Sequence, residues 1–197
     1  MPNTCPPMSP EIEALEKQIW ELGEKLRAAR QAAPPETVQD YIFESPGGPI
    51  ALSELFADRD DLFVVHNMGK RCSYCTLWAD GLNGLAAPLL DRAACVISSP
   101  DDPATQQAFA KSRGWTLPMV SCKDNTFAAD LGYHYPDQNN SYMPGISAFH
   151  RNADGSITRT GHTPFGPYDM YCPVWPLFSL LKGGAGDWQP KFEYGQK

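Results

Sequence analysis

The stretch from Leu62 to Asp80 constrains the fold of this chain more than any other part of its sequence. It opens with four apolar residues, Leu62 to Val65, a run typical of a strand covered by helices on both faces. A short polar turn follows, and then Cys72 and Cys75, separated by two residues. We expect a helix to begin at Cys72. This order of a buried strand, a turn and a helix favours an α/β domain.

The Cys72–Cys75 pair at the start of the expected helix is typical of a thiol–disulfide site. The N-terminus of a helix offers unpaired N–H groups and a partial positive charge, which stabilise a thiolate. Lys70 and Arg71 add two cationic side chains beside Cys72. We therefore predict that Cys72 is the exposed, acidic thiol that attacks a disulfide. Cys75, one turn further into the helix, is predicted to be buried and to resolve the mixed disulfide.

The composition of the chain limits the class of protein, the partners and the cellular compartment to which this site belongs. The chain has 197 residues, of which 42% are hydrophobic and 20% charged, as expected for one globular domain with appendages. The net charge of −7 argues against a nucleic-acid or anionic-membrane partner. No apolar run reaches the roughly 18 residues of a membrane helix, and the N-terminus lacks the apolar core of a signal peptide. We expect a cytoplasmic protein, in which a close cysteine pair is catalytic or metal-binding rather than structural.

A leading helix precedes the domain. Ser9 is a candidate N-cap and Pro10 suits the first helical position. The apolar stripe of this helix repeats at alternating spacings of three and four residues: Ile12, Leu15, Ile19, Leu22, Leu26 and Ala29. The stripe covers either the chain's own domain or a second copy, as a homodimer arm. We divide the chain into residues 1–35, a disordered tail over 1–8 and this amphipathic helix, and a domain over 36–197.

The remaining pattern predicts alternating strands and helices. A hairpin is expected over 41–52, strands over 94–97 and 117–121, and a second hairpin over 145–151 and 156–160. Asp102 and Gly114 mark the two ends of a helix, and Gly81, Gly84 and Pro88 predict a break in the helix after Cys72. Pro176 is expected to open a last helix through Leu181. Together these elements give α/β with a mixed sheet flanked by helices and an N-terminal helical extension.

The sequence resembles the thioredoxin superfamily, and in particular a thioredoxin-like family of unknown function. The shared motifs, specific as a set, are the leading helix, the hairpin from Tyr41, Cys-x-x-Cys followed by residues 78–84, and residues 114–121 and 145–149. The likeness spans about residues 10–182. It implies a thioredoxin-like fold, in which a cis-proline faces the Cys-x-x-Cys, and Pro144 occupies that place. It also implies that His66 occupies the place of a buried acid that moves the proton of Cys75.

Other readings of the cysteines stay open. A zinc site needs four ligands, and His66 and Cys122 would have to join the pair by coincidence of folding. A peroxiredoxin-like thiol peroxidase is an alternative, although residues 68–72 lack the proline and hydroxyl of the peroxidase Pro-x-x-x-Thr/Ser-x-x-Cys pattern. A non-catalytic thioredoxin-like scaffold is a second alternative. Of the other cysteines, Cys95, Cys122 and Cys172 are expected to be buried and Cys5 to lie in the tail.

The sequence therefore predicts a cytoplasmic thiol–disulfide oxidoreductase with a redox-active disulfide, acting on protein or small-molecule disulfides. Cys72, Cys75, His66 and Pro144 are its candidate site residues. No dinucleotide-binding or phosphate-binding glycine motif is present, so we expect no cofactor. Electrons would pass to or from a partner thiol protein or a small thiol. Trp78 is expected to pack in the core.

Overall fold

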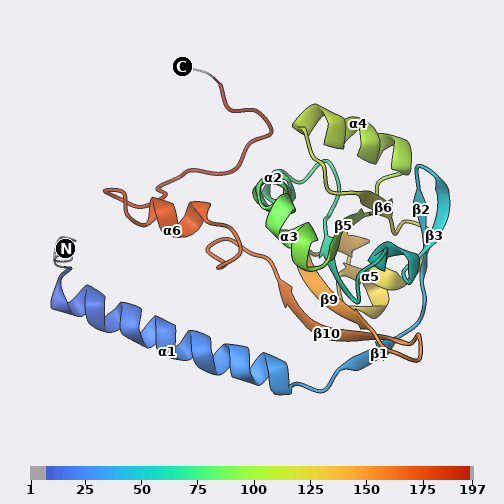
Figure 1. The fold of residues 1–197 in the computed structure, drawn as a ribbon. Helices are drawn as coiled ribbons and strands as arrows, with labels where there is room; N and C mark the ends of the chain where they lie inside the picture. Colours follow the sequence, from blue (N-terminus) through green and yellow to red (C-terminus); the bar gives the residue numbers. More distant parts are fainter. Residues whose placement is uncertain (1–7, 196–197) are drawn as a thin grey trace. The chain divides into compact units, whose positions relative to one another are not determined.

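The computed structural model describes residues 8–195 of the chain (Figure 1). The chain divides into two compact units, Met1–Pro35 and Glu36–Lys197. Except for Met8, the tail predicted to be disordered lies outside the described residues, as does Cys5. None of the described helices is both long enough and apolar enough to cross a membrane.

The first unit consists of one helix, α1 (Pro10–Ala32). The side chain of Ser9 caps it by accepting a hydrogen bond of 3.3 Å from the backbone N–H of Ile12. Pro10 occupies the first position, where a missing N–H leaves no hydrogen bond unmade. The helix ends before Pro34 and Pro35, which cannot continue it. The predicted leading helix is confirmed.

The second unit is built on an eight-stranded sheet in the order β1-β10-β9-β4-β5-β6-β2-β3. Its strands are β1 (Glu36–Val38), β2 (Ile42–Ser45), β3 (Gly48–Ala51), β4 (Asp61–His66), β5 (Ala94–Ser99), β6 (Met119–Ser121), β9 (Gly145–Arg151) and β10 (Ile157–Pro164). The central strands β4, β5 and β6 run parallel, and the other pairs are antiparallel. A separate two-stranded ribbon joins β7 (His134–Tyr135) to β8 (Ser141–Tyr142). The predicted mixed sheet and both predicted hairpins are confirmed.

The sheet has a hydrophobic core on each face. Along β4, Leu62 and Val64 point into one core, whereas Phe63 and Val65 point into the other. The first core also holds residues of the 3-10 turn Glu54–Phe56 and of α5 (Phe127–Asp130). The second core holds residues of α2 (Ser73–Gly84), α3 (Ala86–Arg92) and α4 (Pro103–Arg113). Coverage on both faces explains why residues 62–65 are all apolar.

Local sequence signals set the helix ends. The carboxylate of Asp102 caps α4 by accepting a hydrogen bond of 2.9 Å from the Thr105 N–H. Gly114 ends α4 in the left-handed conformation, with φ +68°. The predicted break falls at Leu85, which separates α2 from α3. These three expectations are confirmed.

The last helix differs from its prediction. We expected it over 176–181, but α6 runs from Val174 to Phe178. Pro176 lies inside its first turn, where a residue without an N–H is tolerated. Beyond Phe178 the chain continues in tight turns, because Leu180 and Leu181 each donate to the carbonyl three residues earlier. The apolar run therefore does not form one regular helix.

Candidate functional site

The loop between β4 and α2 is held by its own polar groups and by a neighbouring loop. The Asn67 side chain accepts a hydrogen bond of 2.8 Å from the Gly69 N–H. Gly69 has a φ of +99°, and a Cβ added there would lie 2.9 Å from a carboxylate oxygen of Asp101, so glycine is required. The same carboxylate accepts a hydrogen bond of 2.6 Å from the Lys70 N–H. This loop delivers Cys72 to the start of α2.

Cys72 is the N-cap of α2, and its sulfur takes part in the cap. The Sγ atom accepts a hydrogen bond of 3.0 Å from the Cys75 N–H. The side chain of Cys75 donates a second hydrogen bond, and it is the largest cause of the lowered pKa of Cys72. Backbone N–H groups of Cys75 and Tyr74 act in the same direction, whereas burial opposes them. The resulting pKa of about 7 leaves about half of the Cys72 thiol ionised at neutral pH.

The causes of this shift differ in part from those expected. We expected the helix N-terminus and the cationic side chains of Lys70 and Arg71 to act together. The backbone N–H groups contribute as expected, but the remaining stabilisation comes from the Cys75 thiol rather than from the two cations. Both cationic residues are exposed, so water screens their charges.

Cys75 lies one turn into α2 and is buried, with 2% of its surface exposed. Its sulfur accepts a hydrogen bond of 3.4 Å from the Met68 N–H. The hydrogen bond to Cys72, followed by burial and by the charge on Cys72, raises the pKa of the Cys75 thiol above its ordinary value. The pair is therefore asymmetric: Cys72 is the thiol that ionises near neutral pH, and Cys75 keeps its proton and donates it as a hydrogen bond.

The structure does not bring His66 to Cys75. Because side chains alternate along a strand, His66 shares the face of Val64, while α2 covers the face of Val65. Its Nε2 atom lies 2.9 Å from the Ser147 hydroxyl. Its ring stacks on two aromatic rings of the α5 side, with centroids 3.7 Å from Tyr133 and 5.4 Å from Phe127.

The surroundings of His66 also decide its protonation. Burial, together with the nearby positive charge of Arg159, lowers the pKa of His66 to about 3. An imidazole with this pKa is neutral at ordinary pH and is a weak base. The predicted proton shuttle therefore has no support in the geometry or in the electrostatics of the site.

Pro144 directly precedes β9 (Gly145–Arg151), the place along the chain that the resemblance implies, but its peptide bond does not have the expected form. The strand register pairs Gly145 with His66, so Pro144 comes just before the point where β9 meets the end of β4. The carbonyl of Pro144 accepts a hydrogen bond of 2.9 Å from the Phe165 N–H. No peptide bond among residues 8–195 is cis, which corrects the prediction of a cis-proline. The trans form found here is the intrinsically favoured form of such a bond.

The sequence did not indicate the cluster of aromatic side chains around Tyr74, which lies between the two cysteines. Tyr74 faces Trp78 and Trp175, with ring centroids 6.1 and 6.3 Å away. Trp78 is buried, as expected, and its ring stacks on Phe165 at 5.4 Å. The position of Tyr74 inside the Cys-x-x-Cys motif was a usable signal. Nothing in the sequence, however, indicated that a residue as distant as Trp175 would reach this helix.

The other described cysteines lie in the cores. Cys95, Cys122 and Cys172 are all buried free thiols, as expected. Burial raises the pKa of each, that of Cys95 to about 11, so these thiols stay protonated. Within residues 8–195 no cluster of three or more His, Cys, Asp or Glu side chains could hold a metal ion. The zinc alternative thus finds no ligand set in the described part of the chain.

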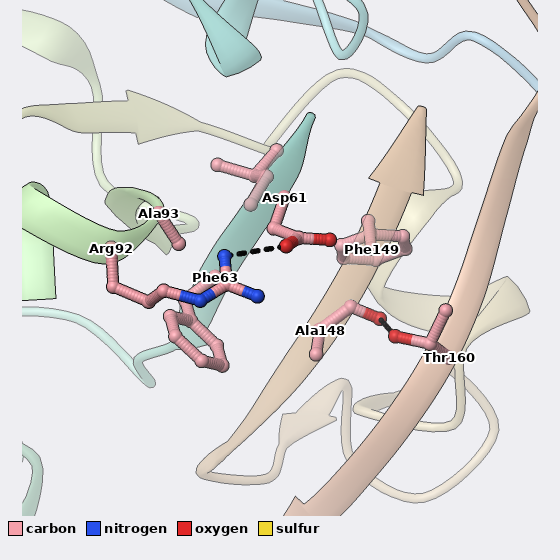
Figure 2. A pocket seen from close by; sticks show the side chains of 8 residues that line it. Asp61, Phe63, Arg92, Ala93, Ala148, Phe149 and Thr160 are labelled. Atoms are coloured by element: carbon pink, nitrogen blue, oxygen red, sulfur yellow. Dashed lines mark hydrogen bonds and ion pairs between the residues drawn. The ribbon is translucent and has the colours of Figure 1, made fainter. Parts of the chain in front are cut away.

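A cavity of about 260 Å³ lies at the other end of β4 (Figure 2). Asp61, the first residue of this strand, accepts a hydrogen bond of 2.6 Å from Arg92 and lies 2.8 Å from Nδ1 of His150. The hydrogen bond to His150 is the largest cause of the lowered pKa of Asp61. No cysteine lines this cavity. Since Cys72 follows the opposite end of β4, the cavity is not part of the thiol site.

Comparison with known families identifies the chain. The model of a family described as "Bacterial protein of unknown function (DUF899)" matches residues 11–188. This chain belongs to the DUF899 family. The match confirms the resemblance to a thioredoxin-like family of unknown function. No curated protein matches the DUF899 chain.

Solved structures similar to the DUF899 chain include several peroxiredoxins. Peroxidoxin BcpB from Mycobacterium tuberculosis is 26% identical, with a TM-score of 0.51 over 62% of this chain and 80% of that one. PrxQ from Xylella fastidiosa is 12% identical, with a TM-score of 0.54 over 72% and 91%. Prx3 from Vibrio vulnificus is 16% identical, with a TM-score of 0.53 over 70% and 90%. The DUF899 chain thus has the predicted thioredoxin-like fold.

Proposed function

We propose that this chain is a thiol–disulfide oxidoreductase that uses Cys72 as its nucleophile and Cys75 as its resolving thiol. The observation that carries the proposal is the asymmetry of the pair. Cys72 has a pKa of about 7 at the half-buried start of α2, whereas the Cys75 thiol is buried and keeps its proton. A thiol with a pKa near the ambient pH is the best compromise between ionisation and nucleophilicity.

The reaction begins with the Cys72 thiolate. It attacks one sulfur of a substrate disulfide, forms a mixed disulfide with that sulfur, and expels the other sulfur as a thiolate. The hydrogen bond and the charge that held the proton on Cys75 are then gone, because Cys72 has become neutral. Two of the three main causes that raise the pKa of Cys75 are therefore removed by the first step itself.

The second step closes the intramolecular disulfide. Cys75 loses its proton to the departing thiolate and attacks Cys72 in the mixed disulfide. The second substrate thiol leaves, and the two electrons of the Cys72–Cys75 dithiol have reduced the substrate. A separate thiol protein or small thiol returns the pair to its reduced form. These two steps need no histidine base. This agrees with the position of His66, which contacts Ser147 and has a pKa of about 3.

A thiol peroxidase is the second candidate function. The observation that favours it is the 26% identity to a protein named as a peroxidoxin. In this reaction the Cys72 thiolate would attack one oxygen of a peroxide and become a sulfenic acid, while the other oxygen leaves as water or an alcohol. The Cys75 thiol would then attack the sulfenic sulfur and form the disulfide, with release of one water. The chain from Met68 to Cys72 lacks the threonine or serine of the peroxidase pattern, so disulfide exchange remains the better-supported activity.

One experiment separates these activities. The reduced protein is mixed either with oxidised glutathione or with hydrogen peroxide, and the loss of each is followed over time. We expect consumption of the disulfide with formation of the Cys72–Cys75 bond, and reaction with peroxide no faster than that of a free thiol. Rapid peroxide consumption would contradict the proposal and favour the thiol peroxidase. A protein that reacts with neither oxidant would favour the non-catalytic thioredoxin-like scaffold.

Two variants assign the roles. Cys72→Ser should abolish the reaction. Cys75→Ser should still attack but should stop at the mixed disulfide on Cys72, which mass spectrometry detects as one added substrate thiol. The same variant, immobilised, would capture protein substrates from cell extract as reducible adducts. A mixed disulfide carried on Cys75 of Cys72→Ser would reverse the assignment.

A further inference from the structure

Helix α1, taken by itself, is a 23-residue helix with an apolar stripe. The five large side chains of the stripe are exposed by between 39% at Leu26 and 69% at Ile19. A single helix has no means of covering its own stripe, because all members of the stripe lie on one side. A stable arrangement therefore requires a second surface for α1.

The spacing of the stripe is the same when read in either direction. Its members follow each other at intervals of three, four, three, four and three residues: Ile12, Leu15, Ile19, Leu22, Leu26 and Ala29. When two copies lie antiparallel, Ile19 of one meets Leu22 of the other at the centre. Leu15 then meets Leu26, and Ile12 meets Ala29. In an antiparallel pair of two copies, every apolar residue of the stripe therefore lies opposite an apolar residue of the other copy.

The charges of α1 favour the same orientation. The half from Pro10 to Glu21 has four glutamates and one lysine, a net charge of −3, and the half from Leu22 to Ala32 has three cations and one glutamate, a net charge of +2. A parallel pair would place acidic beside acidic and basic beside basic halves. An antiparallel pair places each acidic half along a basic half. We propose that α1 is a dimerisation helix that pairs antiparallel with α1 of a second copy of this chain.

The structure offers a matched control for the test. Trp20 is next to Ile19 and is as exposed as Ile19, at 68% against 69%. It lies off the stripe, and Arg27 of the same helix covers its ring at 5.6 Å from the centroid. Trp20 is thus an exposed apolar side chain that the proposed dimer does not bury. Neither residue belongs to the two cores of the second unit, so substitutions at both leave those cores intact.

The mass of the full chain is measured by light scattering and sedimentation over a wide range of concentrations. We expect the mass to double as concentration rises, since a helix of this length pairs only moderately. Ile19→Asp should raise the dissociation constant by about tenfold or more, whereas Trp20→Asp should leave it unchanged. Circular dichroism verifies that both variants keep their folded structure. A chain that stays monomeric at every concentration, or equal effects of the two variants, would overturn the proposal.

A second measurement fixes the orientation. Isotope-labelled and unlabelled chains are mixed, and neighbouring carboxylates and amines are joined by a carbodiimide without a spacer. We expect crosslinks between chains to connect Lys25 with Glu11 or Glu16 of the other copy. Crosslinks of Lys25 to Glu21 or Glu24 of the other copy would indicate a parallel pair and would contradict the proposal. Neither measurement depends on the activity of the thiols.

Discussion

Two ionisable groups near the end of β4, one on each side of the sheet, both have lowered pKa values but with opposite consequences for their charge. On the α2 side, Cys72 receives hydrogen bonds from a thiol and two backbone N–H groups, and its pKa falls to about 7. On the α5 side, His66 lies between aromatic rings, and its pKa falls to about 3. For a thiol, a lowered pKa means more of the reactive anion, whereas for a histidine it means that the cation is lost.

The difference lies in what each side supplies. Burial alone disfavours any charge, so it opposes ionisation of Cys72 and prevents protonation of His66. The α2 side overcomes burial with donors aimed at the sulfur, namely the Cys75 thiol and the backbone N–H groups of Cys75 and Tyr74 at the start of the helix. The α5 side provides a hydroxyl and aromatic faces, which suit a neutral ring. The α2 side of the strand end therefore stabilises a reactive anion, whereas the α5 side packs around a neutral ring.

The largest effect that tests this comparison is a pH dependence of stability from His66. The unfolded state takes up a proton near pH 6.5 and the folded state only near pH 3, so folding loses stability as pH falls between these values. The slope from this one group is roughly 1.4 kcal/mol per pH unit. Urea unfolding at a series of pH values should show a flatter dependence for His66→Phe, which keeps a stacked ring without a titrating group.

The same variant tests whether His66 serves the thiols. We expect the mixed disulfide on Cys72 to resolve at the wild-type rate in His66→Phe, as followed by quenched mass spectrometry. Its hydroxyl partner Ser147 loses a hydrogen bond, so a constant loss of about 1 kcal/mol in the free energy of unfolding is expected at every pH. Slower resolution in the variant would restore the proton shuttle and remove the contrast between the two sides.

The sequence predicted the thiol side well because its signals are local. Four apolar residues, a polar turn and a cysteine at a helix start are all contained in residues 62–75, and each was found as expected. The role given to His66 rested on position along the chain alone. One residue decides which face of a strand a side chain occupies, and the alternation from Val65 to His66 turned the imidazole toward Phe127 and Tyr133.

Contacts between distant residues were beyond the sequence. Asp101, which holds the loop before Cys72, follows β5, the parallel neighbour of β4. Loops after neighbouring parallel strands meet at one edge of a sheet, but the pairing of these two strands had first to be known. Trp175 reaches Tyr74 from the C-terminal part of the chain, and no spacing indicates such a contact. The error in α6 arose because an apolar run has no feature that separates a helix from successive turns.

A smaller effect tests the source of the acidity of Cys72. Removing the thiol donor in Cys75→Ala should raise the pKa of Cys72 by roughly 1–2 units, since a hydrogen bond to a charged group is worth about 1.5–3 kcal/mol. Cys75→Ser, which keeps an O–H donor, should raise it less. The rate of iodoacetamide alkylation of Cys72 as a function of pH gives both values. Equal pKa values for Cys72 in all three proteins would show that the side chain at 75 has no part in the effect.

The smallest effect is expected from Lys70 and Arg71, the two cationic residues that precede Cys72. Lys70 and Arg71 are exposed, and an exposed charge is largely screened at physiological ionic strength. Lys70→Met and Arg71→Met should therefore shift the pKa of Cys72 by less than about 0.3 units, well below the change in Cys75→Ala. The same alkylation profiles, recorded at low and high salt, measure the shift. A pKa that rises by a unit or more in either variant, and rises likewise in the wild type as salt is added, would mean that long-range charge rather than hydrogen bonds activates the thiol. The contrast between Cys72 and His66 would then arise from their exposure to solvent and not from hydrogen-bond donors. His66 is buried, so water does not screen the charge of Arg159 that acts on it.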